Sequence, residues 1–179
     1  MAKFQFKELI VTTPETARLG AGTAEGDRLS DADIGKIVKL VGDSRYNLVA
    51  VGDAIEGVIA AVESYTADGY SIGSVQVKDR KEVTFDGLQG TPGTGVIAVG
   101  DYVVAGTPVA KGTALPAPVK VCKATSQAVA PFMWRVVSLG TAGTGAVGTV
   151  GVIERVNAQL ERQKWLLFTT NKARSNRSR

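Results

Sequence analysis

Short runs in which apolar and polar residues alternate recur along most of this chain. Alternation with a period of two is the pattern of a half-buried β-strand. Turn-forming pairs such as Gly42-Asp43, Gly52-Asp53 and Asp86-Gly87 separate the runs. The pattern predicts strands over residues 36–41, 46–51, 55–63, 70–77, 82–85, 96–99, 102–105, 119–122, 132–137 and 149–156. We therefore expect a mainly β protein, with a body that is a β-barrel or a β-sandwich.

Three local signals add detail to this body. Asp68-Gly69 predicts a tight hairpin, because both central residues of a type I′ turn need positive φ. The alternation shifts across Gly73, which predicts a β-bulge there. The tetrapeptide Ala-Val-Gly-Asp occurs at 50–53 and again at 98–101. We interpret this echo as a repeated type of turn, with a true internal repeat as the alternative.

The two ends of the chain differ from the body in composition. KFQFKELIV at 3–11 places Phe4 and Phe6 on one face, which predicts a strand or an extended arm. The polar, Gly-rich stretch 12–33 has too few large apolar groups to fold alone. The predicted organisation is an extended arm over 1–33, a β-rich body over 34–156 that can split into two sub-barrels near 88–95, and a C-terminal extension over 157–179. Residues 164–169 are interpreted as a last strand, with a helix over 155–168 as the alternative.

The net charge of +4 comes from the end of the chain. The last ten residues hold Lys172, Arg174, Arg177 and Arg179 and no acid, and the rest has equal numbers of basic and acidic residues. The sequence therefore predicts a neutral body with a basic C-terminal tail. A nucleic-acid-binding domain is expected to show a basic face instead.

The candidate chemistry is sparse. The chain has no histidine and one cysteine, Cys122, so the groups that titrate near neutral pH or bind zinc are nearly absent. Carboxylates remain as candidates for acid–base work: Asp27, Asp31, Asp33, Asp43, Asp53, Glu56 and Asp101. We interpret these acids as turn and cap residues, with a weak cation site at Asp31 and Asp33 as an alternative. We predict no enzyme, no cofactor and no metal site.

Three large or reactive side chains are expected in the core. Cys122 ends an apolar run and is interpreted as a small core residue. Trp134 and Trp165 are assigned to core packing, with a binding platform as the alternative.

The longest apolar run is shorter than 18 residues, and the N-terminus lacks the pattern of a secretory signal. We therefore expect a soluble protein made in a reducing compartment, with no membrane partner.

Two phrases and a late strand carry a family resemblance. VAVGDAIEGVIAAVES and VIAVGDYVVAGTPVAKGT are followed by GTVGVIERV. This texture resembles the capsid decoration, or cement, proteins of tailed bacteriophages and the small β-barrel proteins of their heads. In that family a strand ending in GVIE commonly follows an AVGD-x-V turn and strand, which here correspond to Gly148–Glu154 and Ala98–Val104. The resemblance covers residues 34–156 and does not include 157–179.

The resemblance implies a non-enzymatic virion structural protein. Such a protein would be made in the host cytoplasm, decorate the capsid surface, bridge major capsid subunits and associate with copies of itself as a dimer or trimer. A phenylalanine-bearing arm can add a strand to a partner's sheet edge, and a basic tail can lie on an acidic surface. The candidate partner-binding residues are Phe4, Phe6, Lys172, Arg174, Arg177 and Arg179.

Three other functions stay open at the level of sequence. A β-barrel module could bind nucleic acid through the basic tail, although the balanced charge of the body speaks against nucleic acid as a partner. A head-completion or tail protein has the same sequence features as a decoration protein. An enzyme using carboxylates or a Ser–Lys pair ranks last, because no catalytic motif is present.

Overall fold

The computed structural model describes residues 15–22, 24–42, 45–64, 69, 71–77, 80–127 and 134–156. In this part the chain is mainly β, which confirms the predicted class. The strands are β1 (Glu15–Leu19), β2 (Ile37–Gly42), β3 (Arg45–Leu48), β4 (Gly57–Glu63), β5 (Ser71–Gln76), β6 (Arg80–Leu88), β7 (Thr91–Pro92), β8 (Tyr102–Ala105), β9 (Lys120–Lys123), β10 (Trp134–Ser138) and β11 (Val150–Arg155). Two short 3₁₀ helices, η2 (Glu25–Asp27) and η3 (Asp31–Asp33), lie between β1 and β2.

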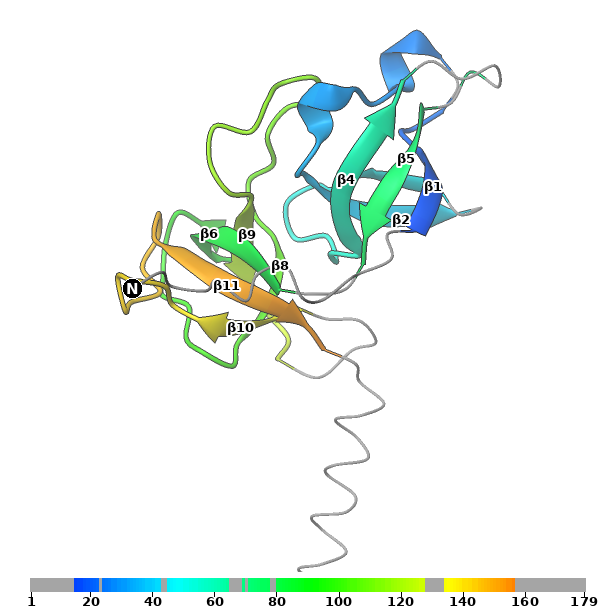
Figure 1. Cartoon of the computed structure of the whole chain (residues 1–179). Coiled ribbons are helices and arrows are strands. Elements are labelled where there is room, and N and C mark those ends of the chain that lie inside the picture. The colour runs from blue at the N-terminus through cyan, green and yellow to red at the C-terminus, as the bar shows by residue number, and fades with distance from the viewer. Residues whose placement is uncertain are drawn as a thin grey trace, which may run out of the picture.

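The strands form two barrels that lie beside each other (Figure 1). The first is closed, with the strand order β1-β3-β2-β4-β5. The second sheet has the order β11-β10-β8-β9-β6-β7, and a further pairing of β11 with β6 closes the strands from β6 to β11 into a second ring. The short β7 forms an antiparallel hairpin with the end of β6, where Thr91 pairs with Leu88. The predicted β-barrel is thus present twice.

The two barrels have the same topology. In the first barrel β1 runs parallel to β3, and the other neighbours are antiparallel. In the second ring β6 runs parallel to β9, and β8, β10 and β11 follow the antiparallel pattern of β2, β4 and β5. Each strand of one ring therefore has a counterpart in the other, in the same order along the chain.

The strand register is also the same in both barrels. A register shift separates Ile59 from Ala61 in β4, and an equivalent shift separates Val136 from Ser138 in β10. Matching cross-strand pairs are Glu15–Val75 with Lys81–Ile153, Arg18–Arg45 with Thr84–Lys120, Val38–Leu48 with Val103–Lys123, Ile37–Val58 with Tyr102–Arg135, and Ile59–Val75 with Val136–Ile153. The chain therefore contains an internal structural repeat.

The repeat places core residues at the same positions. Apolar side chains that face each barrel interior are buried in both copies. The pairs are Ala17 and Val83, Leu19 and Phe85, Val38 and Val103, Tyr46 and Val121, Ile59 and Val136, and Val75 and Ile153. The second core is larger, because Ile37, Val49, Ile55 and Val58 of the first barrel belong to the same cluster as Phe85 and Trp134. The two barrels therefore share a continuous apolar contact.

The Ala-Val-Gly-Asp echo marks a turn type, as interpreted from the sequence. In both copies the aspartate N–H donates to the alanine carbonyl, at 3.2 Å in 50–53 and 3.1 Å in 98–101. The glycines, Gly52 and Gly100, have φ of 83° and 93°. The structural counterpart of Gly100 is Gly35, however, because Gly35 donates to Ile59 of β4 as Gly100 donates to Val136 of β10. The chain thus has a structural repeat, but the two Ala-Val-Gly-Asp segments are not at equivalent positions in it.

Several predicted boundaries are wrong. The division between the barrels falls between β5 and β6 and not near 88–95, because Gly93 donates to Asp86 and folds 88–95 into the β6–β7 hairpin. Residues 15–33, assigned to the arm, belong to the first barrel: β1 pairs with β3 and β5, and Leu29 is fully buried in its core. An extended polar segment can be a barrel strand when its neighbours supply the apolar surface.

Two local predictions also fail. Residues 96–99 form an isolated bridge from Val96 to Ala146 and then a turn, because positive φ at Gly100 reverses the chain. The bulge expected at Gly73 lies on the partner strand, between Ile59 and Ala61. The predicted strand at 102–105 is confirmed at both ends as β8, and the other predicted body strands are confirmed with shifted ends. Strands β4 and β5 pair antiparallel, as the predicted hairpin requires. The expected strands over 3–11 and 164–169 lie outside the described residues.

Candidate functional site

The junction of the two barrels gathers most of the buried polar side chains of the described residues: Asp33, Lys36, Thr84 and Asp86. A long loop, residues 106–118, connects β8 to β9 and runs from the second barrel along η3 of the first, where it is drawn in yellow-green (Figure 1). In the first barrel Gly42 of β2 pairs with Arg45 of β3, so the equivalent connection is only two residues long. We call residues 106–118 the strap, because its contacts join one barrel to the other.

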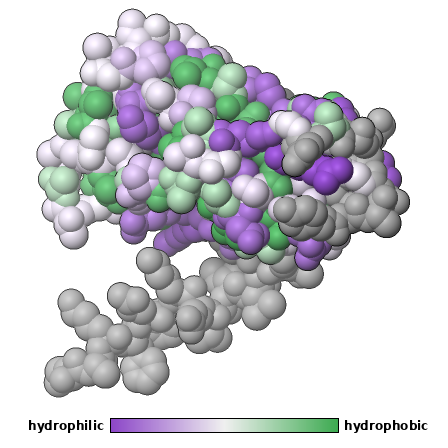
Figure 2. Space-filling model, turned by 90° about the horizontal axis from the view of Figure 1, so that it is seen from above, coloured by the Kyte–Doolittle hydropathy of each residue, from purple (hydrophilic) through white to green (hydrophobic). Residues whose placement is uncertain are grey.

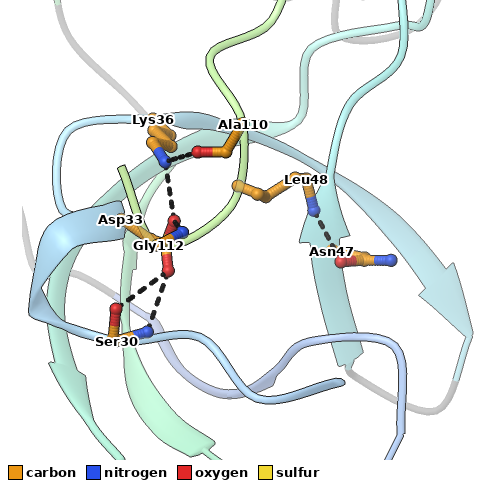
Figure 3. Close-up of polar contacts among 7 residues, drawn as sticks. All are labelled: Ser30, Asp33, Lys36, Asn47, Leu48, Ala110 and Gly112. Atoms are coloured by element: carbon orange, nitrogen blue, oxygen red, sulfur yellow. Dashed lines mark hydrogen bonds and ion pairs between the residues drawn. The ribbon is translucent and has the colours of Figure 1, made fainter. Parts of the chain in front are cut away.

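A buried ion pair holds the strap against the first barrel (Figure 3). Asp33 and Lys36 are 0% and 3% exposed, and the Lys36 Nζ lies 2.7 Å from Asp33 Oδ1. Lys36 Nζ also donates to the Ala110 carbonyl at 2.6 Å, and the Gly112 N–H donates to Asp33 Oδ1 at 2.8 Å. Both partners of the pair therefore bind the strap backbone.

The second carboxylate oxygen of Asp33 organises its own turn. Ser30 donates to Asp33 Oδ2 through its backbone N–H at 2.9 Å and its hydroxyl at 3.3 Å. Burial alone raises the pKa of Asp33, but hydrogen bonds from Lys36, Ser30 and Gly112 outweigh it and hold the pKa below the usual 3.8. The predicted capping role of Asp33 is confirmed, and the ion pair adds a second one.

A second contact joins the barrels through the turn at 50–53. Gly52 donates to the Ala105 carbonyl at 2.8 Å, and Ala105 donates to the Asp53 carbonyl at 2.9 Å. The Asp53 carboxylate accepts from the Ala50 N–H and lies 2.6 Å from the Lys39 Nζ. Burial raises the pKa of Asp53, and the bonds from Lys39 and Ala50 more than reverse this, so the pKa is lowered. The predicted turn role of Asp53 is confirmed.

A third contact lies at the C-terminal end of β11. The Trp134 Nε1–H donates to the Ile55 carbonyl at 3.0 Å, and Trp134 is 1% exposed, which confirms its core assignment. Arg155 donates to the carbonyls of Glu56 and Val77 and pairs with the Glu56 carboxylate at 3.1 Å. Glu56 thus serves as an anchor for the second barrel.

A half-open groove lies beside the Asp33–Lys36 pair. Its walls combine side chains of both barrels and the strap, among them Ile37, Val49, Pro108, Leu115 and Lys120. Lys36 also faces it, but its ammonium is taken up by Asp33 and Ala110. The groove is therefore a seam where the strap rests on apolar residues.

The remaining predicted acids do not converge on one site. Asp101 accepts from the Ala98 N–H at 2.8 Å and pairs with Lys123 at 2.9 Å, which confirms its turn role. Asp31 is exposed in η3, and Asp27 ends η2. Asp43 lies outside the described residues, as do Trp165 and the predicted partner-binding residues Phe4, Phe6, Lys172, Arg174, Arg177 and Arg179.

The single cysteine is a core residue, as predicted. Cys122 is fully buried on β9 and clusters with Tyr102, Val104, Ala124 and Val156. Burial, with a smaller effect from the Asp86 charge, raises the pKa of its thiol to about 11. A thiol with that pKa stays protonated near neutral pH and is a poor nucleophile.

Sequence reasoning missed three residues of the junction. Lys36 stands at the start of an apolar run, where a lysine normally faces solvent. Asp86 was assigned to a turn, yet it is 5% exposed and anchors the strap by accepting from the N–H and hydroxyl of Thr107. Arg155 lies at the end of a strand, and its neighbours in the sequence do not indicate its contact with Glu56 and Val77. The only available signal was an ionisable residue inside or beside an apolar run.

No group of three or more Asp, Glu, Cys or His side chains suited to a metal ion occurs among the described residues. Within the same residues, neither 3₁₀ helix nor any other helix is long and apolar enough to cross a membrane. No family model matches the chain, and neither a curated protein nor a solved structure shows significant similarity to it. The molecule's own residues must therefore indicate its function.

Proposed function

We propose that this chain is a non-enzymatic structural protein that decorates and stabilises the capsid of a tailed bacteriophage by bridging its major capsid subunits. The observation that carries the proposal is that two barrels are joined into one body. They share a hydrophobic core, and three polar contacts join them: the strap at Asp33 and Lys36, the turn at 50–53, and Trp134 with Arg155. A rigid two-barrel body suits a bridge between neighbouring subunits, because little freedom is lost on binding.

The use of the charged groups supports a structural role. Four of the acids that could have served in acid–base chemistry, Asp33, Asp53, Glu56 and Asp101, each pair with a lysine or arginine, and all but Glu56 also accept a backbone N–H. Groups held this way are positioned to fix turns and strands. They are not arranged as a pair of acids flanking a cleft.

The exit points of the terminal segments support attachment at one side of the body. Glu15, the first residue of β1, pairs with Val75, and Arg155, the last residue of β11, donates to Val77 two residues further on. The segment with Phe4 and Phe6 and the basic tail therefore join the body close together. Both can reach one partner, and two linked weak contacts bind more tightly than either alone.

Sedimentation of the full chain with undecorated phage shells tests the proposal. We expect co-sedimentation at a fixed ratio to the major capsid subunit, with dimers or trimers of the free protein. Replacing both Phe4 and Phe6 by serine is expected to weaken attachment at all salt concentrations. Replacing Lys172, Arg174, Arg177 and Arg179 by serine is expected to weaken it most at low salt, where charge attraction is least screened.

Two results would contradict the proposal. One is the absence of co-sedimentation by a folded protein. The other is equal or tighter binding to DNA or RNA of random sequence, lost in the tail variant and steeply dependent on salt, which would identify a nucleic-acid-binding module instead.

A further inference from the structure

Three apolar side chains of the second barrel are exposed where the end of β6, the 93–97 segment and the turn before β11 meet. Leu88, Val96 and Val147 are 38%, 63% and 40% exposed. They are neighbours in space: the Leu88 side chain covers Gly95, the residue before Val96, and Val96 bridges to Ala146, the residue before Val147. We call these three residues the apolar cluster. Figure 1 shows the turn before β11 in yellow.

The cluster is one of several places where large apolar side chains are exposed, and it includes the most exposed of them. Figure 2 shows hydrophobic and hydrophilic residues interspersed across the face seen from above. Val96 is the most exposed large apolar residue among those described. An exposed aliphatic group gains free energy when another apolar surface covers it. A contiguous group of three therefore calls for a partner surface of apolar character.

We propose that the N-terminal segment of this same chain, residues 3–11, docks on the apolar cluster through Phe4 and Phe6. The alternation over residues 3–7 puts Phe4 and Phe6 on one face and Lys3 and Lys7 on the other, so this part of the segment can cover the cluster and keep its lysines in water. The occupant belongs to the chain itself, and we place this docking in the free protein. Contact of Phe4 and Phe6 with a capsid subunit, as proposed above, requires the segment to leave the cluster.

The reach of the chain is sufficient. β1 begins at Glu15, which pairs with Val75, and Val77 receives a hydrogen bond from Arg155 at the end of β11. The six residues of β11 span ~20 Å back toward the turn that holds Val147. The eleven residues from Phe4 to Glu15 span up to ~36 Å when extended. The extended segment is therefore longer than β11, and Phe4 can extend along β11 toward the turn that holds Val147.

Photo-crosslinking of the full chain tests this placement. Phe4 is replaced by p-benzoylphenylalanine, and Gln5, on the opposite face of the segment, receives the same replacement as a matched control. We expect a cross-link at monomer mass from position 4 to tryptic peptides 82–111 or 136–155, which hold the cluster. Position 5 is expected to cross-link to these peptides much less.

Surface variants separate the cluster from general effects on the fold. Val96→Asp combined with Val147→Asp is expected to reduce the position 4 cross-link by about tenfold or more, because a carboxylate would be buried under the phenylalanine. Val41→Asp, at a similarly exposed valine of the first barrel, is expected to leave it unchanged. Circular dichroism of each variant checks that the barrels remain folded.

Three outcomes would overturn the proposal. A cross-link found only between two chains would place the segment on a second copy. A cross-link to residues of the first barrel, or none in a folded protein, would leave the cluster without this occupant. None of these outcomes bears on co-sedimentation with shells, so the failure of this inference is distinguishable from failure of the proposed function.

Discussion

Gly73 in β5 and Gly151 in β11 occupy the same place in the two barrels. A Cβ atom at Gly73 would lie less than 3.0 Å from the Ala61 carbonyl oxygen and from the Leu19 side chain. A Cβ atom at Gly151 would lie less than 3.0 Å from the Ser138 carbonyl oxygen and the Phe85 ring, which are the counterparts of Ala61 and Leu19. Each glycine lets a large core side chain lie directly on the strand backbone.

This equivalence predicts that Gly73→Ala and Gly151→Ala are both destabilising. Each added methyl group must displace a strand carbonyl and a core side chain, which costs about 1–3 kcal/mol. Gly90→Ala is the matched control, because a Cβ there meets nothing within 4 Å. Urea unfolding of the three variants measures the free energy of unfolding. If Gly73→Ala and Gly151→Ala matched Gly90→Ala, the close packing described here would be wrong.

The buried ion pair predicts a strong effect of Lys36→Met. Removing the ammonium leaves the Asp33 carboxylate buried without its cation, and breaking such a pair costs about 3–5 kcal/mol. Lys123→Met breaks the more exposed pair with Asp101, where we expect about 0–1 kcal/mol. Thermal or urea unfolding gives both values.

A second substitution isolates the charge effect at this pair. Asn at position 33 keeps an acceptor for the Gly112 N–H but carries no charge. Asp33→Asn added to Lys36→Met is therefore expected to restore part of the lost stability. Additive losses in the double variant would show that the two residues are not energetically coupled.

The lowered pKa of Asp33 predicts a dependence of stability on acid. The carboxyl is ionised more readily in the folded state than in the unfolded state, so it stabilises the fold above its ordinary pKa. That contribution is complete above about pH 5 and is lost as the pH falls through 3.8 toward the lower folded value. Urea midpoints between pH 3 and pH 7 measure it.

Variants in the same turn assign this acid dependence to Asp33. Asp33→Asn is expected to flatten the fall in stability below pH 5 that the unmodified protein shows. Asp31→Asn, at an exposed position of the same turn, is expected to retain it. An unchanged acid profile in Asp33→Asn would assign the effect to other groups.

We predict that the rate at which the Cys122 thiol is labelled follows global unfolding. It is the only cysteine, it is fully buried, and its pKa is raised to about 11. Iodoacetamide at pH 8 is therefore expected to label the folded protein far more slowly than free cysteine and to label it rapidly in urea. Fast labelling of the folded protein would show that β9 opens without global unfolding.

The strands were predictable because their pattern is local. Alternating runs such as those of β2, β4 and β11 carry their own signal, and Gly52 and Gly100 mark turns that need positive φ. The internal repeat was not predictable. Along the aligned strands only Val38 matches Val103 and Gly73 matches Gly151 in identity, so the repeat is conserved in register and burial and not in residue type.

The junction was hidden for a different reason. The partners of Asp33 and Lys36, Ala110 and Gly112, lie more than 70 residues away and contribute only backbone groups, which leave no trace in residue type. Likewise, β1 has an ordinary polar sequence, and its place in the barrel depends on the strands that enclose it. Non-local contacts of this kind cannot be predicted from periodicity.

The most direct test of the proposed decoration function is the saturation ratio of the full chain on undecorated phage shells, measured by analytical ultracentrifugation. The proposal predicts that bound protein reaches a plateau at a fixed simple ratio to the major capsid subunit, and that the plateau stays at that ratio when more protein is added. Binding that is absent, or that keeps rising without a plateau, would contradict it.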